Sequence, residues 1–165
     1  MLWERNHSIF LLSKAYTGIK KVYLNLKKER RFQMKPLIVY QSRTGNTSII
    51  VDALASILKA DVVPVEDAVQ DHFKGRNLIG FGSGIYWTSV DKKIYKSASF
   101  VPKNCNVFMF ITSGIGHPVL LRMYWNFIKK NFDRFNINLI GRWDCRGYDR
   151  FPLFKWMGLS KGRPN

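Results

Sequence analysis

A six-residue loop, Ser42-Arg43-Thr44-Gly45-Asn46-Thr47, joins two segments with different hydrophobic patterns, and this junction restricts the fold more than any other feature. Residues 37–40 are continuously apolar, as in a parallel strand that is buried on both faces. After the loop, apolar residues recur at helical spacing, at Ile50, Ala53, Leu54, Ile57 and Leu58. The chain is therefore expected to pass from a buried strand through a tight loop directly into a helix.

The chemistry of this loop suits a phosphate group. The first turn of a helix has backbone N–H groups without intrahelical partners, and it carries the positive end of the helix dipole. Hydroxyl and amide side chains in the loop add neutral hydrogen-bonding groups, so a phosphate monoester fits there. The loop is not a Walker A motif, because no Lys follows its last Gly. The later segment 80–85 misses the dinucleotide fingerprint, because Ile85 stands where the third Gly belongs.

The rest of the chain alternates between strand and helix patterns. Strands are predicted at 62–65, 77–82, 107–111 and 137–140, and Pro64 favours an edge position for the first of these. One helix is predicted at 91–100, and another by an apolar face made of Leu120, Met123, Tyr124, Phe127 and Ile128. Alternating elements predict an α/β fold with right-handed crossovers and a parallel sheet covered on both faces.

Residues 37–47 resemble the first strand and FMN-phosphate loop of flavodoxins, an apolar strand followed by Ser/Thr-x-Thr-Gly-x-Thr/Ser. The resemblance implies a doubly wound, three-layer α/β/α fold with a five-stranded parallel sheet of order 2-1-3-4-5, and FMN as cofactor. It places the domain at residues 34–165, after a basic extension of residues 1–33. Residues 145–149 and 161–165 resemble a tail that precedes a final helix in a subgroup of the family, so that helix is expected to be missing.

Ligands of open α/β sheets bind beyond the carboxyl ends of the strands. Three loops are expected to meet there: residues 42–47, residues 83–88 and residues 112–117. The resemblance implies that the second and third loops flank the flavin ring, with Tyr86 or Trp87 stacking on it, although Ile115 and His117 depart from the usual pattern. Beyond the first loop, the expected cofactor-binding residues are Ser83, Gly84, Ile85, Tyr86, Trp87, Thr112, Ser113, Gly114, Ile115 and Gly116. Gly84 and Gly114 are expected to allow close backbone approach or positive φ.

Three functions agree with these patterns. The first is an FMN-binding electron carrier, in which the flavin does the redox chemistry and no catalytic side chain is needed. The second is a flavin-dependent NAD(P)H or quinone reductase. The third is a cofactor-free binding module with a degenerate flavodoxin-like fold.

The net charge of +16, from 27 Lys and Arg against 11 Asp and Glu, bears on partners rather than on the fold. Flavodoxins are usually acidic, whereas this chain is strongly basic. Its redox partners are therefore expected to present an acidic docking surface. Specific nucleic-acid binding is not expected, because the basic residues are dispersed and no motif accompanies them. Residues 8–31 could contact an anionic membrane as an amphipathic helix; alternatively, Met34 is the natural start of the protein.

No apolar run approaches the roughly 20 residues that a membrane-spanning helix needs, and cytoplasmic residence is the default expectation. Cys105 and Cys145 are predicted at the start of one strand and the end of the next, roughly 25 Å apart, so both are expected to be free thiols. The three His residues are scattered, with no metal-ligand spacing to each other or to the cysteines.

Overall fold

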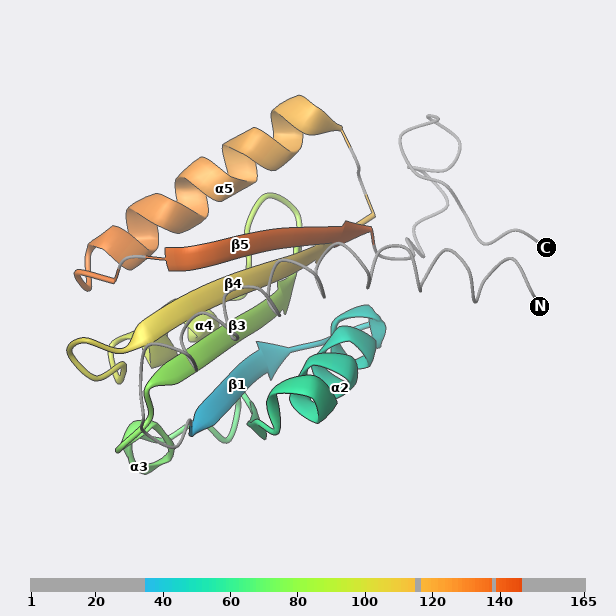
Figure 1. The fold of residues 1–165 in the computed structure, drawn as a ribbon. Helices are drawn as coiled ribbons and strands as arrows, with labels where there is room; N and C mark the ends of the chain where they lie inside the picture. Colours follow the sequence, from blue (N-terminus) through green and yellow to red (C-terminus); the bar gives the residue numbers. More distant parts are fainter. Residues whose placement is uncertain (1–34, 115–116, 138, 147–165) are drawn as a thin grey trace, which may run out of the picture.

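The computed structural model describes residues 35–114, 117–137 and 139–146, which are coloured in Figure 1. In chain order the elements are β1 (Pro36–Gln41), α2 (Asn46–Leu58), β2 (Asp61–Pro64), α3 (Gln70–Phe73), β3 (Leu78–Gly84), α4 (Lys92–Ala98), β4 (Asn106–Ser113), α5 (Pro118–Asp133) and β5 (Leu139–Arg146). Within these ranges, no helix combines the length and hydropathy needed to span a bilayer.

All strand pairings are parallel, and the order is β2-β1-β3-β4-β5, which confirms the predicted topology. Strand order reverses between β1 and β3, so the loops that follow these two strands lie at the switch point where ligands bind in such sheets. The edge position predicted from Pro64 is also confirmed, because β2 pairs only with β1 among the described strands.

Helices cover both faces of the sheet (Figure 1). Leu37 and Val39 of β1 face a core shared with α4 and α5, while Ile38 faces a core shared with α2. Gly82 of β3 shows how tightly the α2 side is filled: a Cβ there would lie 2.3 Å from the ring of Phe110 in the neighbouring strand. The aromatic ring therefore occupies the space that a side chain on β3 would need.

The predicted face of α2 is confirmed at Ile50, Leu54 and Leu58, and Val51 is buried as well. The predicted face of α5 is wrong in part. Tyr124 and Ile128 are buried as predicted, but Met123 and Phe127 are 47% and 49% exposed. The buried face instead continues through Trp125 and Phe132, about one residue further around the helix. The error arose because apolar residues occur on both sides of this helix, and periodicity alone does not say which side packs.

Strand boundaries also differ from the prediction. β3 and β4 extend to Gly84 and Ser113, because their small polar residues stay paired to the end, as in Gly84 opposite Thr112. β5 runs to Arg146, well beyond residue 140, and the short helix α3 was not predicted. Both cysteines are free thiols, as predicted. The segments 1–34 and 147–165 lie outside the described residues, and so do the predictions made for them.

Candidate functional site

The loop of residues 42–47 has the geometry of an anion-binding helix start. Gly45 precedes α2 in the left-handed conformation, with φ of 84°, and the space beside its Cα is open to 4 Å. The first turn of α2 contains no acidic residue, so the helix dipole is not offset there. Two side chains shape the loop: Ser42 Oγ accepts a hydrogen bond from Ser48 N at 3.3 Å, and Asn46 Nδ2 donates to Thr44 Oγ1 at 3.2 Å.

Thr47 ties this loop to the end of β4. Its side chain is 1% exposed, and its hydroxyl lies 2.9 Å from the hydroxyl of Thr112. The carbonyl of Thr112 in turn accepts a hydrogen bond from Ile85 N at 2.8 Å. The structure therefore brings together residues of all three predicted loops, although Thr47 and Thr112 are used for contacts within the protein.

Arg43, Tyr86 and Asp91 form a second connection, which we call the Arg43 clamp. The backbone N–H of Arg43 donates to the Tyr86 hydroxyl at 3.0 Å, and its guanidinium carbon lies 4.2 Å from the centre of the Tyr86 ring. The same guanidinium pairs with Asp91 Oδ2 at 3.0 Å. Gly84 makes room for this arrangement, because a Cβ there would lie 2.7 Å from the Tyr86 hydroxyl. Burial raises the pKa of Tyr86, so its hydroxyl stays protonated at neutral pH.

Asp91 was missed at the sequence level. It caps α4 by accepting a hydrogen bond from Lys93 N at 3.0 Å, and its own N–H donates to Ser83 Oγ at 3.4 Å. Partial burial acts to raise its pKa, but the hydrogen bonds from Lys93 N and from Arg43 outweigh burial and leave the pKa lowered. The signal was available, since an Asp directly before a predicted helix is a common N-cap.

Trp87 occupies a strained and open position. It lies at the tip of a turn closed by reciprocal backbone hydrogen bonds between Tyr86 and Ser89, at 2.8 and 3.3 Å. Its φ is 63°, which is rare for a bulky residue, and its side chain is 90% exposed. Strain of this kind costs about 1–3 kcal/mol and is common at binding sites.

Gln41, the last residue of β1, adds a buried acceptor beside the first loop. The residue is 7% exposed, and its Oε1 has no hydrogen-bond partner among the described residues. Ser113 ends β4 at the same end of the sheet, and Gly114 follows it. Ile115 and Gly116 fall outside the described residues, so their predicted role stays a prediction.

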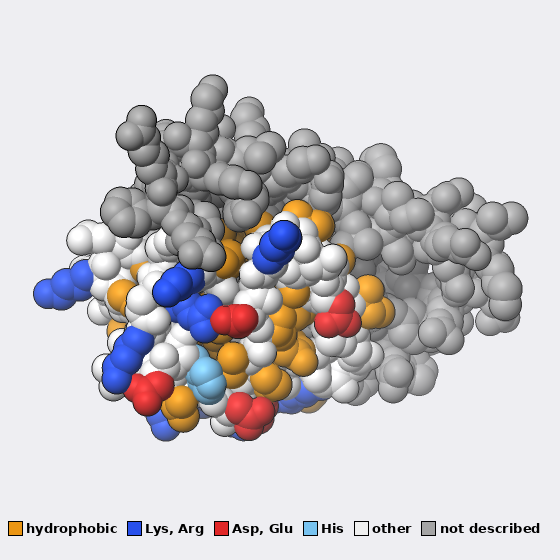
Figure 2. All heavy atoms as spheres, turned by 60° about the horizontal axis from the view of Figure 1, so that its bottom comes forward, with side chains coloured by type: hydrophobic (Ala, Val, Ile, Leu, Met, Phe, Trp, Pro, Cys, Tyr) orange, Lys and Arg blue, Asp and Glu red, His pale blue; other side chains and the backbone are white. Residues whose placement is uncertain are grey.

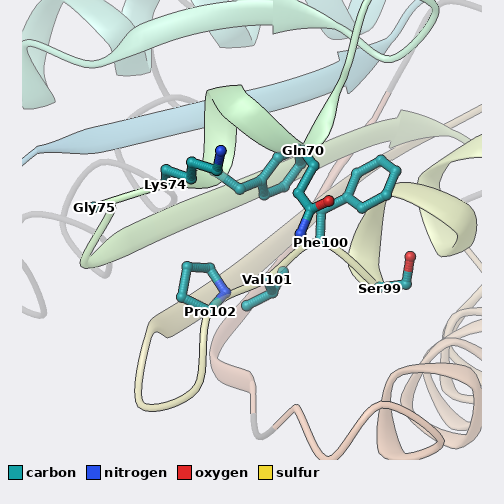
Figure 3. A pocket seen from close by; sticks show the side chains of 8 residues that line it. Gln70, Lys74, Gly75, Ser99, Phe100, Val101 and Pro102 are labelled. Atoms are coloured by element: carbon teal, nitrogen blue, oxygen red, sulfur yellow. The ribbon is translucent and has the colours of Figure 1, made fainter.

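Two cavities of the described part of the chain lie away from these loops. One, of about 380 Å³, lies beside the segments that precede β3 and β4, at the opposite end of the strands. It is lined by Gln70, Phe73, Lys74, Gly75, Ser99, Phe100, Val101 and Pro102 (Figure 3). A second, of about 410 Å³, is lined mainly by Lys35, Lys59, Asp61, Lys74 and Arg76. A phosphate loop binds through backbone groups at the surface, so a deep cavity is not needed at the candidate site. Among the described residues, no cluster of three or more His, Cys, Asp and Glu could hold a metal ion.

The sheet order and the loop-to-helix junction define a flavodoxin-like α/β protein. A family model described as a flavodoxin domain matches residues 37–113. An uncharacterized protein of Methanocaldococcus jannaschii is 34% identical over 134 residues, covering 80% of this chain and 89% of that protein. The chain therefore belongs to the flavodoxin-domain family, as the resemblance predicted.

Solved structures support the same fold. A flavodoxin from the domain Archaea aligns with a TM-score of 0.53 and 18% identity, covering 71% of this chain and 87% of the flavodoxin. An NADH:FMN oxidoreductase, solved in its apo form, aligns with a TM-score of 0.53 and 10% identity, covering 69% of this chain and 75% of the oxidoreductase. Because both identities are low, these likenesses concern the fold.

Proposed function

We propose that this protein binds FMN at the three loops and transfers electrons between partner proteins. The observation that carries the proposal is the start of α2, where left-handed Gly45 and a helix turn without acidic residues face open space. A phosphate there would meet backbone N–H groups and the Thr44 hydroxyl. When bound, FMN supplies the redox chemistry, and the protein supplies its position and electrostatic surroundings.

Two further features of the chain fit a flavin. Gln41 offers a buried acceptor beside the loop, and a ribityl hydroxyl of FMN is a donor of the kind that would satisfy it. Trp87 presents an exposed aromatic face on a tight turn, and aromatic stacking is the usual contact for a flat ring. Tyr86 has a different role in this proposal. Its ring is already packed under Arg43, so it positions the second loop and leaves stacking to Trp87.

Comparing FMN with riboflavin tests the phosphate contact. Thr44→Ala should weaken FMN about 10- to 150-fold, because a hydrogen bond to a charged group contributes about 1.5–3 kcal/mol, and should leave riboflavin almost unchanged. Titration calorimetry or flavin fluorescence measures both ligands. Ser56→Ala, at an exposed position of the same helix, is the matched control. Equal losses for FMN and riboflavin would refute a phosphate site at this loop.

The role of Trp87 has its own test. Trp87→Gly should weaken FMN and riboflavin by similar factors, since both carry the same ring. The same substitution should raise the stability of the ligand-free protein by up to about 1 kcal/mol, because Gly adopts positive φ without strain. If the variant becomes more stable but binds both flavins normally, Trp87 does not stack on the ring.

The proposed redox partner is a protein with an acidic docking surface, in keeping with the net charge of +16. Electron transfer to an acidic acceptor should therefore be faster at low than at high salt, whereas a basic acceptor of similar potential should show the opposite dependence. Stopped-flow mixing with chemically reduced protein measures both rates. Steady oxidation of NAD(P)H by the FMN-loaded protein, without an added reductase, would instead identify a flavin-dependent enzyme.

A further inference from the structure

The outer face of α5 has an exposed apolar row that neither the fold nor the flavin site uses. Val119, Met123 and Phe127 are 67%, 47% and 49% exposed, and they recur every four residues along the helix. Spacing of four places them side by side on one stripe. The buried residues Trp125 and Ile128 belong instead to the core beneath the helix. The helix is therefore apolar on both sides, although only one side packs against the sheet.

The polar residues beside this row are mainly basic. Arg122, Lys130 and Arg134 are exposed, and none of them forms an ion pair with another described residue. Lys129 is the exception, because it pairs with Asp133, the single acidic residue of the helix, at 2.7 Å. By helical geometry, Lys130 and Arg134 continue the apolar stripe toward the end of the helix. This side of α5 therefore combines large apolar side chains with positive charge.

Other parts of the surface have a different character. Figure 2 shows a face on which Lys and Arg side chains stand beside Asp and Glu side chains, with hydrophobic side chains between them. Elsewhere on the domain, several basic residues are neutralised in pairs, as in Lys74–Asp71, Arg76–Asp61 and Lys93–Glu66. What sets α5 apart from these regions is that its unpaired basic residues lie beside a row of exposed apolar side chains.

We propose that the outer face of α5 binds the surface of an anionic lipid membrane. The helix lies along the outside of the sheet (Figure 1), and its 16 residues form a convex ridge about 24 Å long. Such a ridge can insert apolar side chains to the depth of the headgroups while the basic residues contact anionic lipid.

Two other occupants fit the observations less well. A symmetric dimer through α5 would bring Arg122, Lys130 and Arg134 of both protomers into one interface, where their like charges repel. A protein partner needs roughly 800 Å² on each side for a stable interface, and three side chains on a single convex helix provide only a small part of that. A membrane needs no matching shape. A single amphipathic contact gives weak and reversible binding, and the basic segment of residues 1–33 could supply a second one.

The test is co-sedimentation of the full chain with vesicles of phosphatidylcholine alone or with 30% phosphatidylglycerol, at 0.15 M salt. The double variant Met123→Ser/Phe127→Ser should lower the partition coefficient on the anionic vesicles about 25-fold, or about fivefold for each half-exposed side chain. The matched control is Ile49→Ser/Val69→Ser, which removes apolar residues that are 61% and 54% exposed on other elements. It should stay within twofold of the wild type.

Charge provides a second arm. Arg122→Gln/Lys130→Gln should weaken binding to anionic vesicles by about 25-fold in total, since each basic residue near the surface contributes about fivefold. All of these residues are exposed, so circular dichroism and thermal unfolding should match the wild type. The proposal fails if the wild type ignores anionic vesicles, or if the α5 variants bind as well as the control. It also fails if size-exclusion chromatography shows a dimer that the α5 variants convert to monomer. None of these readouts requires bound FMN.

Discussion

Asp91 offers the sharpest test of how the candidate site is held together, because one carboxylate caps α4 and also pairs with Arg43. Asp91→Ala removes both contacts. Loss of an N-cap costs about 0.5–2 kcal/mol. The ion pair adds at most about 1 kcal/mol, because the Arg43 side chain is 56% exposed. The expected loss in the free energy of unfolding is therefore about 0.5–3 kcal/mol.

A second variant separates the two contacts. Asn is as good an N-cap as Asp, so Asp91→Asn keeps the cap and removes only the charge. The free energy of unfolding of this variant should fall by at most about 1 kcal/mol, which is less than the fall for Asp91→Ala. In a double-mutant cycle with Arg43→Gln, Asp91→Asn should cause almost no further loss of stability, because the guanidinium that pairs with Asp91 is already absent. Urea denaturation followed by tryptophan fluorescence and circular dichroism gives all of these values.

The pH dependence follows from the lowered pKa of Asp91. A carboxyl group whose folded-state pKa lies below its ordinary value of 3.8 contributes stability above that value and loses it as the pH falls through the folded-state pKa. The stability difference between the wild type and Asp91→Asn should thus be constant from pH 7 to 5 and disappear in acid. Equal losses for the Asn and Ala variants at pH 7, or a difference that does not shrink as the pH falls further and further below 3.8, would refute this account.

Three further outcomes are expected. Gly82→Ala should lower the free energy of unfolding by about 1–3 kcal/mol, because the new Cβ would lie 2.3 Å from the Phe110 ring. Adding Phe110→Leu to this variant should restore part of the loss, as measured by urea denaturation. Only one of the two thiols should react quickly with a thiol reagent at pH 8, because burial raises the pKa of Cys145 to about 11; both should react in urea. Thr112→Val should lower the free energy of unfolding by about 1–3 kcal/mol, because it leaves the buried Thr47 hydroxyl without its partner. Unlike Thr44→Ala, it should weaken the binding of both FMN and riboflavin.

The fold could be predicted because its signals are local. A continuous apolar run such as residues 37–40 marks a buried strand, and the order of strand and helix patterns limits the topology to a few arrangements. The strand ends were harder to place. Ser83, Gly84, Thr112 and Ser113 have loop-like composition, yet they remain paired in the sheet, because a neighbouring strand supplies partners that composition does not reveal.

The candidate site was predicted as a set of residues, but the contacts that organise it were not. The ion pair of the Arg43 clamp joins residues 48 positions apart, and no local pattern announces a contact of that kind. The two aromatic candidates show the consequence. Tyr86 and Trp87 are neighbours in sequence, yet one is packed under Arg43 and the other is 90% exposed.

The difference between these two residues follows from the backbone at the turn. Reciprocal hydrogen bonds between Tyr86 and Ser89 close the turn, and Gly84 leaves room for the Tyr86 hydroxyl to reach Arg43 N. With Tyr86 fixed against the first loop, the next side chain must leave the turn from a left-handed residue and point to solvent. An exposed Trp at a strained position contributes nothing to the core, and this is why we propose that a ligand covers it. In this proposal the Arg43 clamp holds the loops together, and Trp87 is left available to bind the ligand.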